Sequence, residues 1–133
     1  MDKITVADLT SFADASLKHA TELHDLIVDL LRQGKSVGAL GASTKGNVIL
    51  QYYRLDASLI TAAAERSPEK WGKYTIGSWI PIVSEDEARA AQPDYFLVLP
   101  WHFQNFIVER EQAFLRNGGR LIFPLPTISV VGL

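Results

Sequence analysis

The sequence predicts an α/β fold of three layers, in which a mostly parallel sheet of five or six strands lies between helices. Short apolar runs of strand length alternate with helical patterns along the chain, and this order favours strand–helix–strand units. One run, Tyr95 to Leu99, is continuously apolar, as expected of a strand covered on both faces. A glycine-rich turn ends the first run and opens a helix, which is typical of Rossmann-like domains. The 133 residues suffice for one such domain.

The composition is that of an ordinary soluble globular protein, with 47% apolar and 21% charged residues. The net charge of -2 provides no field that would attract nucleic acid or an anionic membrane, so we expect neither as a partner. There is no cysteine, which excludes disulfides, a thiol nucleophile and a zinc–thiolate site. No segment has the apolar length to span a bilayer and the N-terminus lacks a signal-peptide pattern, so we expect a cytoplasmic protein.

The N-terminal residues, from about 5 to 33, predict a long helix. Apolar residues recur there at steps of mostly three or four and form one stripe: Leu9, Phe12, Leu17, Ala20, Leu23, Ile27 and Leu30. Gly34 would end the helix. We treat residues 1–34 as a lead-in helix and residues 35–133 as the Rossmann-like domain. The stripe could face this domain, a neighbouring domain or a second copy, so a homodimer stays open.

The next segment predicts a short buried strand, Val37 to Leu40, which is followed by the glycine-rich turn and a helix. A helix that starts in this turn directs its positive dipole end and its unpaired N–H groups at a bound anion. We therefore predict a phosphate-binding site made of Gly41, Ala42, Ser43, Thr44, Lys45, Gly46 and Asn47. Neither the P-loop nor the dinucleotide fingerprint matches, so a plain strand-to-helix turn stays open as the alternative.

The helix after the turn should run from about Lys45 to Leu55. Its expected apolar face consists of Val48, Tyr52 and Leu55. Leu59 to Ala64 predict the second strand, and Glu65 stands at its carboxyl end. In nucleotide-binding α/β sheets an acidic residue at this place often accepts hydrogen bonds from a ribose. A solvated loop carboxylate is the alternative of equal weight.

A long polar segment, Arg66 to Ser78, follows the second strand, and loops of this length are usually functional or disordered. It combines cations with aromatic rings, namely Arg66, Lys70, Trp71, Lys73 and Tyr74. Such a mixture suits a ligand with a phosphate and a flat base, and we select Lys70 and Tyr74 as nucleotide or sugar contacts. The alternative is a surface loop with solvated charges and one packed Trp.

The third strand, Trp79 to Val83, contains Pro81 and is therefore expected to be short or at an edge of the sheet. Ser84-x-x-Glu87 is a capping box, and it should open a short helix that ends near Ala91.

Trp101 and His102 follow the apolar fourth strand at its carboxyl end, where open α/β sheets bind their ligands. We take both as candidate nucleotide or sugar contacts, and His102 as a candidate for proton transfer. The alternatives are a Trp101 that packs in the core and a His102 that caps the next helix or lies in water.

A helix should then extend from Phe103 to Arg116, and Asn117-Gly118-Gly119 should end it. Its inward residues are expected to be Phe106, Ile107, Arg110, Ala113 and Phe114. Leu121 to Phe123 predict a fifth strand, and Ile128 to Val131 predict a short final strand at an edge.

Several sequence blocks occur in an order that carries a resemblance. The blocks are Gly41-Ala42-Ser43-Thr44-Lys45-Gly46-Asn47, Pro68-x-Lys70-x-Gly72-x-Tyr74, Ile80-Pro81-Ile82, Pro93 to Phe103, and Gly118-Gly119 followed by Pro124-x-Pro126. Together they resemble the C-terminal domain of the S-adenosylmethionine-dependent sugar C-methyltransferases, from the first strand to the end of the chain. The sequence departs from that pattern at four positions: Leu40 and Ile76, where an aromatic and a proline are usual, and Glu65 and His102, where Asp and Asn are usual.

The resemblance implies that the domain binds and orients a nucleotide-linked keto-deoxysugar, of the dTDP-sugar type, for methylation of a sugar carbon. S-adenosylmethionine and the main acid–base residues would then lie on a separate methyltransferase domain, in cis or in trans. We accordingly expect no cofactor and no metal on this chain, and no turnover from this chain alone.

Two other classes of protein stay open. One is a stand-alone module that binds a nucleotide or a nucleotide-sugar without a methyltransferase partner. The other is a structural or dimerisation domain without a ligand, in which the long first helix would be buried against a second copy. A dehydrogenase would bind NAD, but the missing dinucleotide fingerprint argues against that activity.

Overall fold

The computed structural model describes the chain from residue 6 to residue 133, and the side chains of residues 17–43 and 46–133. Its α-helices are α1 (Val6–Arg32), α2 (Thr44–Tyr52), α3 (Glu85–Ala90), α4 (Gln104–Arg110) and α5 (Gln112–Arg116). Its strands are β1 (Val37–Leu40), β2 (Ala63–Glu65), β3 (Ile82–Ser84), β4 (Tyr95–Val98), β5 (Arg120–Phe123) and β6 (Ser129–Val131). The short 3₁₀-helices are η1 (Pro68–Lys70) and η2 (Trp101–Phe103).

In this described part of the chain, six strands form one sheet in the order β3-β2-β1-β4-β5-β6. The strands from β3 to β5 are parallel to one another, and β6 pairs antiparallel with β5 at one edge. Ala39 of β1 is aligned with Ala63 of β2 on one side and with Leu97 of β4 on the other. The connection after β1 leads to β2 on one side, and the connection after β4 leads to β5 on the other side. The boundary between β1 and β4 is therefore a topological switch point. The predicted mostly parallel α/β fold is confirmed.

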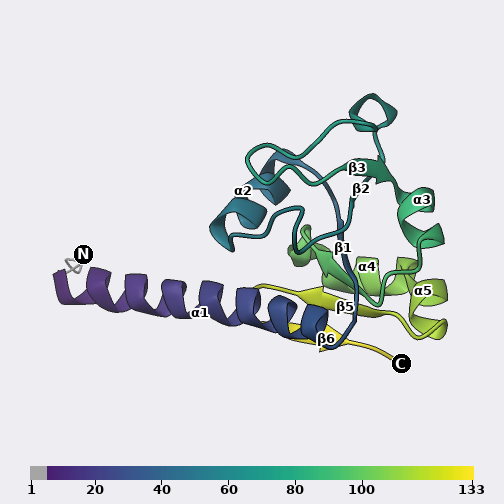
Figure 1. Ribbon diagram of the computed structural model, residues 1–133. Coiled ribbons are helices and arrows are strands. Elements are labelled where there is room, and N and C mark those ends of the chain that lie inside the picture. Colours follow the sequence, from purple (N-terminus) through teal and green to yellow (C-terminus); the bar gives the residue numbers. More distant parts are fainter. Residues whose placement is uncertain (1–5) are drawn as a thin grey trace.

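Helices cover both faces of the sheet, so the domain has three layers (Figure 1). On one face, Leu23 of α1 and Leu50 of α2 belong to the apolar cluster that contains Ala39 of β1. On the other face, Ile107 of α4 belongs to the cluster that contains Leu40, and α3 and α5 contribute to the same cluster. Ala39 and Leu40 fall in different clusters because successive side chains of a strand point to opposite faces of the sheet.

The predicted long helix is confirmed as α1, which spans 27 residues. Its buried residues are Ala20, Leu23, Ile27 and Leu30. Leu17 is 58% exposed, so the predicted stripe is wrong at this position, and the side chains of Leu9 and Phe12 lie outside the described residues. The reason is length: a helix of this size spans roughly 40 Å and extends beyond the short strands on which it packs (Figure 1). None of the described helices, α1 included, is long and apolar enough to cross a membrane.

Helix α2 ends before Leu55, and it buries a different face from the predicted one. Leu50 and the following Tyr53 are buried, whereas Val48 is 63% and Tyr52 is 50% exposed. The predicted apolar face is therefore wrong at Val48 and Tyr52. Leu55 is buried, but it lies beyond the end of the helix. The first turn of α2 packs closely against the chain, because Gly46 lies against the Gly41 carbonyl and the Leu99 side chain. We attribute the orientation of α2 to this packing and not to its apolar stripe.

Strand β2 is shorter than predicted, because Leu59 belongs to a turn. Asp56 accepts a hydrogen bond from the N–H of Ser58 at 2.9 Å, an arrangement that stabilises a turn at this point. The predicted third strand is wrong at Trp79, which follows a turn and has a φ of 58°, and β3 begins only at Ile82, after Pro81. Strand β3 is short and lies at an edge of the sheet, as Pro81 predicted. The predicted cap is also confirmed, since Ser84 Oγ accepts a hydrogen bond from the N–H of Glu87 at 3.0 Å.

The single helix predicted for residues 103–116 is replaced by η2, α4 and α5, with a break at Glu111. Ile107 and Phe114 are buried as predicted. Phe106 is 59% exposed and Ala113 is also exposed, so the predicted inward orientation of these two residues is wrong. At the break Glu111 has a φ of -95° and a ψ of 24°, outside the helical range, and its buried carboxylate contacts the guanidinium groups of Arg89 and Arg110.

Candidate functional site

A cleft of about 550 Å³ lies at the topological switch point, at the carboxyl ends of β1, β2 and β4. The turn after β1 contributes Gly41 and Ser43, and the end of β2 contributes Glu65 and Arg66. The other wall comes from the segment after β4, from α4 and from the start of α3. Open α/β sheets bind their ligands in this crevice, and a volume of this size suits a small-molecule ligand. The cleft is therefore the candidate ligand site.

The glycines of the turn have a structural role that the sequence left open. Gly41 has a φ of 86°, and a Cβ at this position would lie 2.6 Å from Cδ of Pro100. A Cβ on Gly46 would lie 2.6 Å from the carbonyl oxygen of Gly41 and 2.9 Å from Cδ1 of Leu99. The glycines thus allow α2 to pack closely against the end of β4. This packing accounts for both glycines without a ligand.

Most backbone N–H groups of the turn are occupied by the protein itself. The N–H groups of Gly41 and Ala42 both donate to the carbonyl of Ala64 at 3.0 Å. The N–H of Ser43 donates to the carbonyl of Gly41 at 2.8 Å, and Ser43 Oγ accepts from the N–H of Gly46 at 3.1 Å. These four N–H groups are therefore not available to a ligand.

The donors that remain for an anion are at the first two positions of α2. By the geometry of an α-helix, the N–H groups of Thr44 and Lys45 have no acceptor within the helix. The side chains of these two residues lie outside the described part of the chain. Asn47 donates its N–H to the carbonyl of Ser43 at 2.9 Å, and its side-chain Oδ1 is buried without a partner among the described residues. Binding of a phosphate at this turn stays a prediction, and the N–H groups at the start of α2 are the donors that it would use.

Glu65 is the last residue of β2, and its side chain is only 12% exposed. Its Oε1 accepts hydrogen bonds from the N–H groups of Arg66 at 2.9 Å and Ser67 at 3.1 Å. The ammonium of Lys70 lies 3.8 Å from Oε2, and Trp71 Nε1–H donates to the Glu65 carbonyl at 2.7 Å. The carboxylate is therefore held in one orientation in the cleft, and Oε2 has acceptor capacity left for a ligand hydroxyl.

The far wall of the cleft carries a network of charges that the sequence did not reveal. The guanidinium of Arg110 contacts Glu85 at 3.1 Å and Glu111 at 3.2 Å. Arg89 binds Glu111 through two hydrogen bonds of 2.9 and 2.7 Å. The pKa of Arg89 is raised, chiefly by its hydrogen bonds with Glu111, and partial burial opposes this shift. The network fixes Arg110, which lines the cleft, through partners up to 25 residues away.

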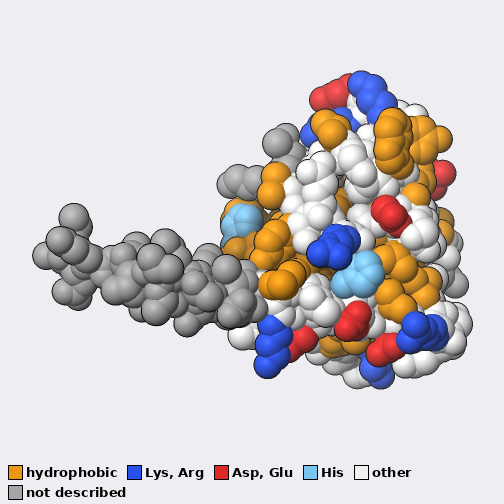
Figure 2. Space-filling view, turned by 60° about the vertical axis from the view of Figure 1, so that its left-hand side comes forward, with side chains coloured by type: hydrophobic (Ala, Val, Ile, Leu, Met, Phe, Trp, Pro, Cys, Tyr) orange, Lys and Arg blue, Asp and Glu red, His pale blue; other side chains and the backbone are white. Residues whose placement is uncertain are grey.

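Exposed hydrophobic side chains are a second feature of the surface. Figure 2 shows such side chains on the body of the domain, with acidic and basic side chains between them. The loop between β2 and β3 contributes Tyr74, Ile76 and Trp79, which are 58%, 73% and 70% exposed. The rings of Tyr74 and Trp79 lie 6.5 Å apart, and Tyr74 is bridged to Pro81. Tyr74, selected from the sequence as a ligand contact, thus belongs to this exposed loop and does not line the cleft.

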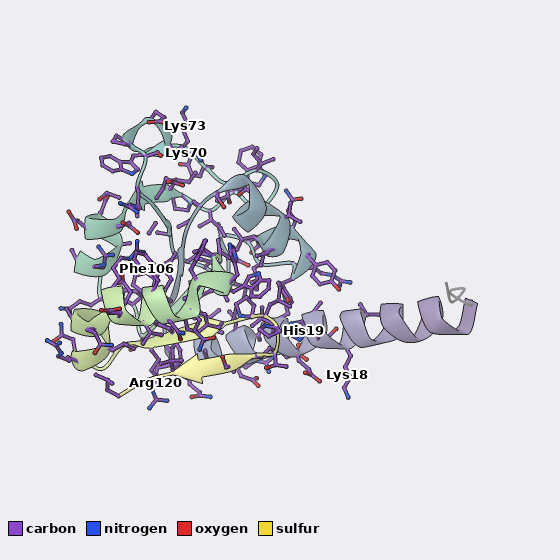
Figure 3. All side chains as sticks on the ribbon, turned by 180° about the vertical axis from the view of Figure 1, so that it is seen from behind. Lys18, His19, Lys70, Lys73, Phe106 and Arg120 are labelled. Atoms are coloured by element: carbon purple, nitrogen blue, oxygen red, sulfur yellow. The ribbon has the colours of Figure 1, made fainter. Side chains whose placement is uncertain are left out.

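The structure also places the other candidates. Lys70 lies beside Glu65. Figure 3 shows Lys70 near Lys73, at the top of the domain in that view. Trp101 is half-buried against the apolar cluster on the α4 face. His102 is exposed, and its ring centroid lies 4.2 Å from that of Phe103. Neither Trp101 nor His102 lines the cleft, and the described residues contain no group of three potential metal ligands.

The fold and the candidate site together define a Rossmann-like domain with a cleft at its switch point. A family model described as the C-methyltransferase C-terminal domain matches residues 2–126. The chain is also 36% identical over 120 residues to C-methyltransferase NovU of Streptomyces niveus. The chain belongs to the C-methyltransferase C-terminal domain family. The match covers 90% of this chain but 29% of NovU, so the chain spans less than a third of the length of this relative.

The close packing at the turn gives a first prediction. We expect Gly46→Ala to lower the free energy of unfolding by about 2 kcal/mol, because the new methyl group would meet the Gly41 carbonyl oxygen and the Leu99 side chain. Urea unfolding followed by circular dichroism measures this loss. The matched control is Gly132→Ala, where the new Cβ would meet only the flexible side chain of Arg120. Equal stability of the two variants would contradict the packing described here.

Proposed function

We propose that this domain binds and orients a nucleotide-linked keto-deoxysugar, of the dTDP-sugar type, for methylation of a sugar carbon. S-adenosylmethionine would be bound by a separate methyltransferase domain, in cis or in trans. One observation carries the proposal: a single cleft joins the turn at the start of α2 to Glu65 at the end of β2. Membership of the C-methyltransferase C-terminal domain family supports it.

Each part of the cleft has a chemical role in this proposal. The diphosphate lies at the N-terminus of α2, where the helix dipole and the N–H groups of Thr44 and Lys45 favour an anion. The Lys45 ammonium adds a positive charge. Glu65 accepts a hydrogen bond from a ribose hydroxyl through its free acceptor capacity. Beside it, Lys70 neutralises the carboxylate and limits its repulsion of the phosphates.

The reaction itself is assigned to the partner domain. Methylation of a sugar carbon needs removal of a proton next to the ketone and attack of the resulting carbanion on a sulfonium methyl group. The contribution of this domain is orientation, since a fixed nucleotide holds the sugar where a catalytic base can reach it. His102 is exposed beside Phe103 and lies outside the cleft, so we assign it no proton transfer. We expect no turnover from this chain alone.

The proposal predicts a specific pattern of binding. In a calorimetric titration, the purified chain should bind thymidine diphosphate and should bind neither S-adenosylmethionine nor NAD. Lys45→Ala should weaken the diphosphate about tenfold, the size of one charge-assisted hydrogen bond. The matched control is Lys35→Ala, because Lys35 is exposed just before β1, at the opposite end of the sheet, and should leave binding unchanged.

Each other outcome of this titration would contradict the proposal. If a folded chain bound no diphosphate, a structural or dimerisation role would replace ligand binding. Binding of S-adenosylmethionine alone would move the methyl donor onto this domain. Binding of NAD alone would favour a redox function.

A further inference from the structure

We infer that the end of the cleft formed by Phe103, Phe106 and Ile107 is a subsite for a flat ring, the base of the nucleotide, which it binds by stacking without distinguishing between bases. This inference rests on the proposed function, because it names a part of the same ligand. It adds a subsite on α4 that has no counterpart among the sequence-predicted contacts.

The two phenylalanines are exposed where large apolar side chains are usually covered. Phe103 is 56% and Phe106 is 59% exposed, and both line the cleft, next to the buried Ile107. In Figure 3, Phe106 projects from α4 toward the side of the domain where Lys70 and Lys73 lie. Two exposed aromatic rings in one concave site are unfavourable in water and offer a surface for a ligand ring.

The ring of Phe106 is held in place by the charge network. The guanidinium of Arg110 lies 5.8 Å from the centroid of the Phe106 ring, within the range of a cation–π contact. Arg110 itself is fixed by Glu85 and Glu111. Because the ring is oriented by partners from α3 and from the α4–α5 break, a ligand that stacks on it need order little new structure.

The subsite shares one cleft with the two other proposed contacts. β1 and β2 are neighbours, with Leu40 aligned with Ala64, so the turn and Glu65 are about one strand spacing apart, near 5 Å. The aromatic end follows β4, which pairs with β1 on the side away from β2, and it lies on the opposite face of the sheet from α2. A ligand bound at the turn and at Glu65 thus has the phenylalanine rings within the same cleft of about 550 Å³ and can place its base against them.

The three side chains that form this end of the cleft carry no hydrogen-bond donor or acceptor, which is why we expect little discrimination between bases. The nearby carboxylate of Glu85 accepts a hydrogen bond from Arg110 through Oε2. Arg110 in turn donates to two carboxylates. Base-specific recognition needs free donors and acceptors, whereas stacking accepts every base because each has a π face.

The test is a calorimetric titration of the full chain with thymidine, uridine and adenosine diphosphates and with inorganic pyrophosphate. Phe106→Ala should weaken all three nucleotides by roughly tenfold and leave pyrophosphate unchanged. Phe103→Ala should act in the same direction. The control is Tyr52→Ala, which removes an aromatic ring of similar exposure, 50%, that does not line the cleft. The three nucleotides should bind the wild type within a few-fold of one another.

The outcomes separate this inference from the proposed function. If the nucleotides bind the wild type and both phenylalanine variants equally well, the subsite is wrong while the proposed function stands. An equal loss of pyrophosphate and nucleotide affinity would also overturn the subsite, because the ring would then not be what the residue contacts. Strong preference for one base would overturn the stacking mode. If no nucleotide binds the folded wild type, the proposed function fails and the subsite with it.

Discussion

Replacing Glu111 by leucine should lower the free energy of unfolding by about 3 kcal/mol, because two guanidinium groups would lose the carboxylate that they share. Glu111 is fully buried, and it receives two hydrogen bonds from Arg89 and one from Arg110. The expected loss lies at the lower end of the range for a broken buried ion pair. The reason is that the side chains of Arg89 and Arg110 remain 32% and 26% exposed and can be partly hydrated.

Urea unfolding followed by circular dichroism measures this loss, and Glu109→Leu is the matched control. Glu109 is exposed on the same helix, so its replacement should change stability by less than about 0.5 kcal/mol. A surface ion pair contributes less than about 1 kcal/mol to stability. If Glu111→Leu lowered the free energy of unfolding by no more than that, the burial of Glu111 would be contradicted.

The same carboxylate gives the domain a defined response to acid. Burial by itself would raise the pKa of Glu111, but the hydrogen bonds and charges of Arg89, and then those of Arg110, lower it overall from its ordinary value of 4.5. A group with a lowered pKa in the folded state stabilises the protein above its unfolded-state pKa. This stabilisation is lost as the pH falls below 4.5 and through the folded-state value. The stability of Glu111→Leu should therefore depend less on pH in this range.

Truncation of Leu23 to alanine should cost about 3 kcal/mol of stability, since this side chain is fully buried between α1 and the sheet. The loss combines the transfer of the side chain with the cavity that remains. The control is Leu17→Ala, the same substitution on the same helix, because Leu17 is 58% exposed and its truncation should change stability by less than about 0.5 kcal/mol. Urea unfolding of the two variants measures the difference, and equal losses would show that α1 does not pack on the sheet as described.

The order of strands and helices could be predicted from the sequence because it depends on local patterns. The apolar run at Tyr95–Leu99, the capping box at Ser84 and the glycine turn each identify an element without knowledge of the rest of the chain. The sheet position of Glu65 followed as well, since the acidic residue ends a strand that lies next to the turn. These features need only periodicity, capping and the crossover rules.

The far wall of the cleft could not be predicted, because it depends on contacts distant in sequence. Phe106 falls on the apolar face of the single helix predicted for residues 103–116, but it is 59% exposed. Glu111, at the break between α4 and α5, is bound by Arg89, which lies 22 residues away. No local pattern marks that pair, so the exposure of Phe106 and the role of Arg110 emerge only from the folded chain. The same holds for Tyr74 and His102, whose distance from the cleft depends on loop geometry.

The three tryptophans would report on different parts of the domain. Trp71 and Trp79 lie in the loop between β2 and β3 and are 42% and 70% exposed. Trp101 follows β4, is half-buried and packs against the apolar cluster on the α4 face. Unfolding would remove this cover, so the emission of Trp101 should shift when the domain unfolds. The Trp71 indole donates to the carbonyl of Glu65, which lines the cleft, so its emission would respond to a change at that residue.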